Sequence, residues 1–362
     1  MPESVEVRKF ADILSKNILD KKITHINILK GRYHSPKKPF EGYDELVKAL
    51  PLTIKSIKTK GKFTYMTLVS YVESVKVNEK VQILKFYLFN TLGLSGGWTL
   101  KSNKKSNFAK CNHCNYMEIE EAENNKNDDN DKNKYIYTFP SILEYITDDR
   151  QNQWFKRALN HLNVEFITDY KNISFYFYDQ LSFGTLKSVE SNDNKIDNKT
   201  NPELINSPIL EKKLKDLGPD LLDETTTFEI FKTQLRKKVN DAKAIGNVIV
   251  NQKIVSGVGN YLRADGLWMA KISPFRKVKD INDNELELLY KSLVGLIWGD
   301  YDYKNGVKKG YINKSLKLPN DYKRDFFIYR QEKDIYDNLV KKEELYEGSQ
   351  KRFIYWVPKY QA

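Results

Sequence analysis

The stretch IVNQKIVSGVGNYLRADGLWMAKISP, residues 249–274, says most about the fold. Within it, Gly257-Val258-Gly259-Asn260 separates two segments whose apolar residues recur with helical spacing. The glycines allow a tight turn whose backbone N–H groups, with the N-terminus of the following helix, can bind a phosphate. A helix C-cap followed by a turn explains the same glycines without any ligand. The stretch therefore predicts two helices joined by a tight turn, with phosphate binding as one of two interpretations.

The sequence around this stretch is also helical from Pro202 onward. Helical periodicity, interrupted by Gly, Pro and Asp signals, occurs in SPILEKKLKDLG, TTFEIFKTQLRKKVN, AKAIGNVIVNQKIVSG, GNYLRADGLWMAK and DNELELLYKSLVGLIW. After Tyr301 the composition becomes basic and strand-like, and EGSQ (347–350) can connect two strands as a hairpin. We expect a helical domain over residues 202–320 and a β-hairpin over 321–362.

The first 201 residues predict one helix followed by a β-rich domain. The helix, from Val5 to about Leu19, has one apolar face formed by Val7, Phe10, Ile13, Leu14 and Ile18. Segments rich in β-branched and aromatic residues follow at 23–29, 62–69, 81–89, 135–139, 163–168 and 173–179. Two polar tracts, 121–134 and 190–201, are expected to be surface insertions, because they bury too little apolar surface to offset the entropy of ordering. The predicted fold class is α+β, with an N-terminal β-sandwich or barrel over 1–201.

Composition restricts the class of protein. Lys and Arg total 60 against 48 Asp and Glu, and a net charge of +12 with a pI near 9.2 favours a polyanionic partner such as nucleic acid. No apolar run approaches the roughly 20 residues of a membrane span, and the N-terminus lacks the apolar core of a signal peptide. Cys111, His113 and Cys114 offer at most three ligands where a structural zinc takes four. We expect an intracellular protein, and the family resemblance set out next implies a monomer that needs no metal and no cofactor.

The string GVGNYLR, followed by an acid and Leu-Trp, closely resembles the helix–two-turn–helix (H2TH) motif of the formamidopyrimidine-DNA glycosylase/endonuclease VIII family. It is most similar to the endonuclease VIII branch. The resemblance implies that Gly257, Gly259 and Asn260 bind DNA. The same family begins its mature chain with Pro-Glu after loss of the initiator Met, and these residues are Pro2 and Glu3 here.

The opening residues MPESVE therefore have two interpretations. As local structure, Pro2 suits the first turn of a helix, and Glu3 and Glu6 lie favourably near the positive end of its dipole. The resemblance implies instead that the secondary amine of Pro2 is the nucleophile, that Glu3 donates and accepts protons, and that Glu6 positions water or the amine. An α-amino group has a pKa of about 7.7–8.0, so part of it is unprotonated near neutrality. Lys62, in a Gly-Lys turn, would contact a phosphate; a solvated strand-end lysine is the alternative.

The resemblance extends to three further segments. NTLGLSGGW (90–98) resembles the loop that fills the space left by an everted base, with Leu94 as the apolar wedge. DQLSFGTL (179–186) resembles the second such loop and contains Leu181, Ser182 and Phe183, but lacks the arginine that contacts the opposite base. RFIYWVPKYQ (352–361) has Val357 and Tyr360 where zinc-binding cysteines would stand. It resembles a zincless finger, held by Phe353, Tyr355 and Trp356, with Arg352 at its tip to reach phosphates.

The resemblance implies a bifunctional DNA glycosylase/AP lyase of base excision repair that acts on damaged DNA, both duplex and single-stranded. Oxidised pyrimidines and hydantoins are the expected substrates, with formamidopyrimidines as a further class. The competing hypothesis is a nucleic-acid-binding protein that keeps the H2TH motif without catalysis. The N-terminal Pro-Glu separates the two hypotheses, because binding alone gives no reason for it. A basic interaction protein with strands and helices is the third alternative.

Overall fold

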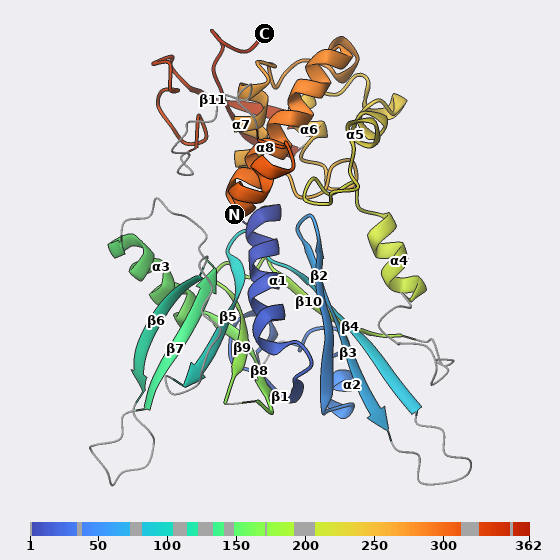
Figure 1. The fold of residues 1–362 in the computed structure, drawn as a ribbon, viewed down its shortest axis with the longest axis vertical. Coiled ribbons are helices and arrows are strands. Elements are labelled where there is room, and N and C mark those ends of the chain that lie inside the picture. Colours follow the sequence, from blue (N-terminus) through green and yellow to red (C-terminus); the bar gives the residue numbers. More distant parts are fainter. Residues whose placement is uncertain are drawn as a thin grey trace. The chain divides into compact units, whose positions relative to one another are not determined.

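The computed structural model describes residues 2–34, 38–72, 82–103, 114–121, 133–140, 148–170, 172–191, 207–312, 326–347 and 350–362 (Figure 1). The chain forms two compact units. The sheet unit comprises Met1–Pro2, Glu6–Thr59 and Phe63–Lys213. The helical unit comprises Glu3–Val5, Lys60–Lys62 and Leu214–Ala362. Two short segments from early in the sequence therefore belong to the helical unit. They contain Glu3 and Lys62, two of the candidate site residues.

The sheet unit contains a single antiparallel sheet of ten strands in the order β10-β4-β3-β2-β1-β8-β9-β5-β7-β6. Its strands are β1 (Lys22–Ile28), β2 (Leu52–Lys60), β3 (Phe63–Val72), β4 (Gln82–Thr91), β5 (Gly96–Asn103), β6 (Cys114–Glu121), β7 (Asn133–Pro140), β8 (Leu162–Thr168), β9 (Ser174–Asp179) and β10 (Thr185–Glu190). Its helical elements are α1 (Ser4–Ile18), η1 (Gly31–Tyr33), α2 (Tyr43–Lys48), α3 (Asp148–Asn160) and α4 (Pro208–Lys215).

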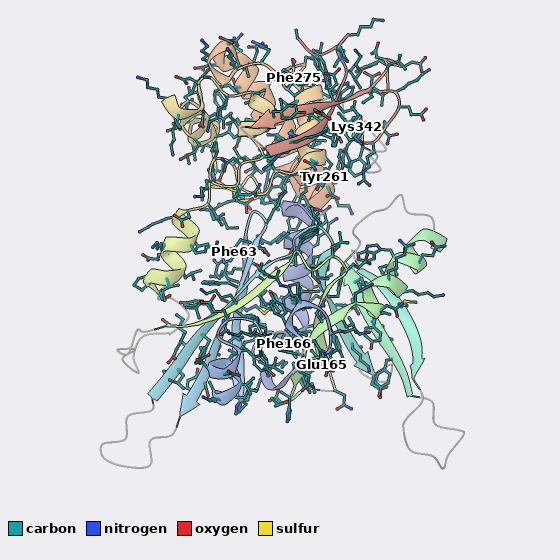
Figure 2. All side chains as sticks on the ribbon, turned by 180° about the vertical axis from the view of Figure 1, so that it is seen from behind. Phe63, Glu165, Phe166, Tyr261, Phe275 and Lys342 are labelled. Atoms are coloured by element: carbon teal, nitrogen blue, oxygen red, sulfur yellow. The ribbon has the colours of Figure 1, made fainter. Side chains whose placement is uncertain are left out.

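Helix α1 lies between the two halves of this sheet, with β5, β6 and β7 on one side and β2, β3 and β4 on the other (Figure 1). Its predicted apolar face is confirmed, because all five residues of that face are buried in one core. Phe166, labelled in Figure 2, stacks on Phe175 with ring centroids 4.7 Å apart in the same core. The apolar face of α1 thus packs against the inner faces of both halves of the sheet.

The α+β class is confirmed, with one difference in architecture. The strands form one continuous sheet, joined through the β1–β8 pair, rather than the two separate sheets of a sandwich. Strand β5 was not predicted, because it begins with two glycines, which are unfavourable in strand interiors. Gly97 is required there by a close approach: a Cβ at this position would overlap the ring of Tyr178. The polar tract at 122–132 and the predicted domain boundary near 201 lie outside the described residues.

The helical unit confirms the change to helical structure. Its helical elements are α5 (Phe228–Leu235), η2 (Lys238–Asn240), α6 (Ile245–Val248), α7 (Asn260–Met269), η3 (Val278–Asp280) and α8 (Asp283–Lys308). Helix α8 begins with a capping box in which Asn282 and Glu285 each accept the other's backbone N–H. Glycine allows α7 and α8 to pack closely, since a Cβ at Gly266 would lie 2.5 Å from Leu293 Cδ2.

One predicted helix is shorter than expected. The segment 242–257 forms the single turn α6 and then two non-helical turns. The Gln252 side chain explains the difference, because its amide group donates to the carbonyl oxygens of Val250 and Val258 at 2.9 Å. Its oxygen accepts the N–H of Gly257 at 2.8 Å. These bonds hold the backbone in turns where helical periodicity alone would continue the helix.

The C-terminal hairpin is formed by β11 (Lys341–Glu347) and β12 (Gln350–Trp356), which pair antiparallel with Glu347 opposite Gln350. Tyr355 packs edge-on against Tyr329, and Trp356 packs edge-on against Phe275, as expected of residues that hold the hairpin. Phe353 does not pack in this way, since 45% of its surface is exposed. The expectation for Phe353 was therefore wrong, because its ring lies beside the amino groups of Lys342 and Lys351 and not against another ring.

No helix in the described part of the chain is both long and apolar enough to cross a membrane.

Candidate functional site

The carboxylate of Glu3 lies at the N-terminus of α7, inside the helical unit. It accepts the backbone N–H groups of Gly259 at 2.6 Å, Tyr261 at 3.0 Å and Leu262 at 3.4 Å. Only 1% of Glu3 is exposed to solvent. A helix N-terminus has unsatisfied N–H groups and a positive dipole end, so a buried carboxylate there is stabilised in its charged form. A residue at the start of the chain thus caps a helix 256 positions away.

Gly259 is a glycine because two charged groups occupy the space of its missing side chain. A Cβ built on Gly259 would overlap Oε1 of Glu3 and Nζ of Lys62. The backbone at this residue is extended, with φ −130°, so the requirement is steric rather than conformational. The predicted site residues Glu3, Lys62 and Gly259 therefore converge on one point of the helical unit.

The turn that carries Lys62 is fixed by a buried carboxylate. Gly61 has a positive φ of 58°, and its N–H donates to Oδ2 of Asp220 at 2.7 Å. A Cβ at Gly61 would lie 2.5 Å from the backbone nitrogen of Gly257, so the two turns meet backbone to backbone. The predicted Gly-Lys turn is confirmed, and Asp220 holds Lys62 beside the start of α7.

The amide groups of the two motif glycines already have protein partners. The N–H of Gly259 donates to Glu3, and that of Gly257 donates to Gln252. The carbonyl oxygen of Gly257 accepts the N–H of Ser4 at 3.1 Å. This geometry does not favour the expectation that these two amides bind a phosphate. The glycines serve close packing instead, because a Cβ at Gly257 would lie 2.6 Å from Cβ of Ser4.

Pro2 and Glu3 lie elsewhere than the local interpretation predicts, whereas Glu6 lies where it was expected. Helix α1 begins at Ser4, so Pro2 and Glu3 precede it and are not in its first turn. Glu3 therefore lies against the dipole of α7 instead of α1. Glu6 is in the first turn of α1 and is 3% exposed. Because Glu3 precedes the helix, Glu3 and Glu6 do not lie on successive turns of one helical face.

Arg263 connects α7 to the C-terminal hairpin. It is fully buried, and its Nη2 donates to Oδ1 of Asn260 at 3.2 Å and to the carbonyl oxygen of Phe353 at 2.6 Å. Burial, with a smaller contribution from the neighbouring Arg352 guanidinium, lowers the pKa of Arg263 to about 10. Two predicted DNA-binding residues, Asn260 and Arg352, therefore lie around one buried guanidinium. Arg352 is half-buried within β12, opposite Leu345, and not in the turn itself.

Asp265, the acid of the motif, is completely buried. Its Oδ1 accepts the N–H groups of Ile328 at 3.0 Å and Tyr329 at 3.1 Å, which fixes the segment that precedes the hairpin. Burial raises the pKa of Asp265 to about 7, although these N–H groups oppose the shift.

The four predicted loop residues come together on the sheet unit. Leu94, Leu181 and Phe183 are 46%, 55% and 58% exposed, so none of them is a core residue. Ser182 has a left-handed conformation with φ 58°. A Cβ at Gly93 would lie 2.6 Å from the nitrogen of Gly184, so the two loops touch backbone to backbone. Three apolar side chains thus project from one pair of loops.

Two residues that sequence reasoning missed hold these loops. Asp179 is buried, and its carboxylate accepts Ser95 Oγ at 2.7 Å and the N–H groups of Leu181 at 3.2 Å and Gly184 at 2.6 Å. Arg32 donates through Nη1 to the carbonyl oxygens of Ser182 and Gly184, both at 3.1 Å. The aspartate directly before a turn is a local signal for Asp179. Arg32 carries no local signal, because its partners lie 150 positions away.

Aromatic rings and one carboxylate occupy the region of the predicted zincless finger. Tyr360, which stands where a cysteine would, stacks with Trp268 at 5.5 Å between ring centroids. Trp268 Nε1 donates to Asp334 at 3.1 Å, and Asp334 also accepts the N–H groups of Tyr336 and Asn338 at 2.9 Å. Among the residues that the structure describes, no three His, Cys, Asp or Glu side chains form a potential metal site. Cys111 and His113 lie outside the described residues, as does the side chain of Cys114.

Comparison with known protein families agrees with this geometry. Residues 217–300 match the formamidopyrimidine-DNA glycosylase H2TH domain, and residues 315–362 match the formamidopyrimidine-DNA glycosylase C-terminal domain. Endonuclease 8 of Klebsiella pneumoniae subsp. pneumoniae is 32% identical over 101 residues, which are 28% of this chain and 37% of that protein. Formamidopyrimidine-DNA glycosylase of Rickettsia canadensis is 29% identical over 122 residues, 34% and 43% of the two chains. The chain thus spans less than half the length of these relatives.

Solved structures share the whole fold. The Lactococcus lactis Fpg in complex with DNA containing an abasic site is 18% identical, with a TM-score of 0.60 and 99% of each chain covered. The same enzyme with DNA containing an oxidized pyrimidine is 19% identical, with a TM-score of 0.60. The fold and the turn around Gly259 are those of a protein with an H2TH domain. The chain is thus similar to the formamidopyrimidine-DNA glycosylase/endonuclease VIII proteins in two matched domains and shares the fold of a solved member.

Gly259→Ala tests the convergence of Glu3 and Lys62. We expect the free energy of unfolding to fall by about 1–3 kcal/mol, because the added methyl group displaces a carboxylate that has three N–H donors. Urea denaturation measures the loss. In a Glu3→Ala background the same substitution should cost less, because the overlap with the carboxylate is gone. Strictly additive costs would contradict this account.

The buried acid predicts a pH dependence of stability. The pKa of Asp265 is raised on folding, so the folded state binds the proton more tightly than the unfolded state. Its contribution is therefore complete at low pH and declines as pH rises toward 7, by roughly 2 kcal/mol between pH 5 and pH 7. Asp265→Asn should remove this decline, even if the substitution lowers the free energy of unfolding by a constant amount at every pH. Urea denaturation midpoints at pH 5, 6, 7 and 8 test this prediction. Parallel curves of midpoint against pH for the wild type and Asp265→Asn would refute it.

Proposed function

We propose that this protein is a bifunctional DNA glycosylase/AP lyase of base excision repair that uses the N-terminal amine of Pro2 after removal of Met1. The observation that carries the proposal is that Glu3, the residue next to Pro2, is buried at the N-terminus of α7 beside Lys62. The family resemblance and the matched H2TH domain supply the substrate class, which is damaged DNA.

The proposed reaction begins at the damaged nucleotide. The secondary amine of Pro2 attacks C1′ and gives up its proton to Glu3, the glycosidic bond breaks, and the damaged base leaves as an anion that water protonates. Opening of the sugar ring gives an iminium ion, which carries its positive charge without further protonation. This electron sink acidifies the 2′ proton, so the 3′ phosphate is eliminated. A second elimination removes the 5′ phosphate and leaves a one-nucleotide gap.

The contacts of Glu3 support an order for its proton transfers. Three N–H donors stabilise its carboxylate form, so it acts first as a proton acceptor and as a counter-ion to the iminium. It donates a proton only after it has accepted one, for example to the oxygen of the opened sugar. Lys62 lies beside Glu3 and is assigned to a phosphate, while Glu6 is assigned to positioning water or the amine.

The paired loops are assigned to the space left by the extruded base. Removing a base from the stack costs a few kcal/mol, and exposed apolar side chains on a fixed backbone replace part of the lost stacking. Leu94, Leu181 and Phe183 have this exposure, and Asp179 and Arg32 hold their backbones. Oxidised pyrimidines and hydantoins are the proposed substrates, following the endonuclease VIII resemblance.

A non-catalytic H2TH protein that binds nucleic acid is the alternative. The contact between Glu3 and α7 is also consistent with this alternative, because capping the helix would by itself explain why Glu3 is buried. The alternative gives no role to a secondary amine next to that residue. Covalent trapping separates the two functions.

Borohydride trapping on an oligonucleotide with an abasic site tests the nucleophile. We expect a covalent adduct with the mature protein and its loss in Pro2→Gly or when Met1 is retained. Gel electrophoresis after reduction measures the adduct. Ser4→Ala is the matched control, because it is a neighbouring change at a hydroxyl that makes no hydrogen bond within the described residues.

An undiminished adduct in Pro2→Gly would falsify the assignment of Pro2. Binding of DNA by the mature protein without any adduct would favour the non-catalytic alternative.

The loop chemistry predicts weak discrimination of the opposite base and activity on single strands. Leu181 provides no polar side-chain group, and the Nη1 donors of Arg32 point to two carbonyl oxygens. Excision rates opposite A, C, G and T should therefore agree within about ten-fold, since a bidentate base contact is worth roughly 1–3 kcal/mol. Single-turnover kinetics on four duplexes and one single strand measure these rates. A hundred-fold preference for one partner base would contradict the prediction.

A further inference from the structure

One face of the C-terminal hairpin carries exposed aromatic residues among lysines. Antiparallel register places Glu344 opposite Phe353 and Tyr346 opposite Lys351, and the side chain of Lys342 alternates onto the same face. We call these five residues the hairpin platform. The opposite face of the hairpin carries Leu345 and Ile354, which are 4% and 1% exposed and belong to the core. Tyr355 lies on the same face as the platform, opposite Lys342, but packs against Tyr329. The five platform residues are the solvent-exposed part of that face, and Figure 2 labels Lys342 among them.

The aromatic residues of the platform are unusually open to solvent. Phe353 is 45% exposed and Tyr346 is 58% exposed, although both side chains are large. Neither is needed to hold the hairpin, since Tyr355 and Trp356 make the ring contacts with the rest of the unit. Exposed aromatic rings on a fixed backbone are a feature of binding surfaces.

The lysines are placed against the rings. Nζ of Lys342 lies 4.5 Å from the ring centroid of Phe353, and Nζ of Lys351 lies 5.2 Å from it. Glu344 pairs with Lys351 and accepts the hydroxyl of Tyr346, which fixes both side chains. Two lysines and one glutamate leave the platform with a net charge of +1. A ligand for this surface therefore combines flat π faces with negative charge.

The backbone beneath Phe353 is also fixed. Its carbonyl oxygen accepts Nη2 of Arg263 at 2.6 Å, and the same guanidinium bonds to Asn260 of α7. Little conformational entropy is lost when a ligand stacks on a ring whose backbone is already held. The adjacent residue in β12 is Arg352, the phosphate-binding candidate of the proposed function.

We propose that the hairpin platform binds unpaired nucleobases of single-stranded DNA, with Phe353 and Tyr346 as stacking surfaces and Lys342 near the phosphates. Only an unpaired strand offers free base faces, because neighbouring pairs cover them inside a duplex. An acidic protein would satisfy the lysines but not the exposed rings. The proposal rests on the proposed DNA-repair function for its choice of DNA, and it assigns the binding of single strands to the hairpin platform.

Binding of unmodified DNA by the full chain tests the platform without any chemistry. The probes are a fluorescent oligothymidine of about 15 nucleotides, near the upper end of the roughly 4–16-nucleotide sites of known single-strand-binding domains, and a duplex of equal length without a lesion. Phe353→Leu keeps the apolar volume but removes the π face. We expect it to weaken single-strand binding by about ten-fold and duplex binding by less than about two-fold, because one stacked base is worth roughly 1–3 kcal/mol. Fluorescence anisotropy measures both affinities.

Three variants sharpen the comparison. Phe353→Trp should retain single-strand affinity, since it retains an aromatic face. Lys342→Ala should reduce the salt dependence of single-strand binding by about 0.7 in slope, whereas Phe353→Leu leaves the slope unchanged. Ile335→Ala is the matched control, because Ile335 is an exposed apolar residue of the same unit that lies outside the platform.

Each contrary result overturns the proposal. Equal losses on single strand and duplex, or no loss in Phe353→Leu, would exclude base stacking at the platform. So would an equal loss in binding of polyglutamate, which is a polyanion without bases. Tighter Phe353-dependent binding of the matching RNA would exclude DNA as the ligand. Absence of a borohydride adduct with retained Phe353 dependence would refute the catalytic function alone, and the reverse pattern would refute the platform alone.

Discussion

The carboxylate of Glu3 at the N-terminus of α7 is the interaction on which the candidate site depends. A buried charge is unfavourable unless it is hydrogen-bonded, and here three backbone N–H groups and a helix dipole meet that requirement. The same carboxylate excludes any side chain at Gly259 and lies beside Lys62. Residues from the start, the first third and the last third of the chain are thereby fixed at one point.

The molecule uses the same solution wherever its backbone is irregular. Buried or nearly buried carboxylates accept backbone N–H groups at four other places: the Gly-Lys turn, the paired loops, the segment before the hairpin and the turn at Asp334. Such residues satisfy amides that no helix or strand can pair, so loops keep a defined shape without a metal ion. The segments that carry the candidate functional side chains are the ones held in this way.

Local sequence predicts the parts of this protein that depend on local physics. The apolar face of α1, the helix after Gly259, the Gly-Lys turn and the terminal hairpin follow from spacing and turn residues. The helix predicted over 242–257 failed because the Gln252 side chain competes for its backbone groups. Spacing does not reveal that Glu3 caps α7, that Arg263 reaches Phe353, or that Arg32 supports a loop 150 residues away. The chemical roles of Pro2 and Glu6 stay predictions that only reactivity can test.

The turn at Asp334 has a consequence for the conditions under which the C-terminal segment stays folded. Its carboxylate accepts two backbone N–H groups and the indole of Trp268, and the rings of Tyr336 and Tyr360 stack beside it. Residues 326–362 contain no cysteine and no histidine. An oxidant therefore finds no thiol in this segment to convert to a disulfide. The C-terminal segment of a protein proposed to repair oxidised bases is thus held by a carboxylate and aromatic rings, and not by thiols.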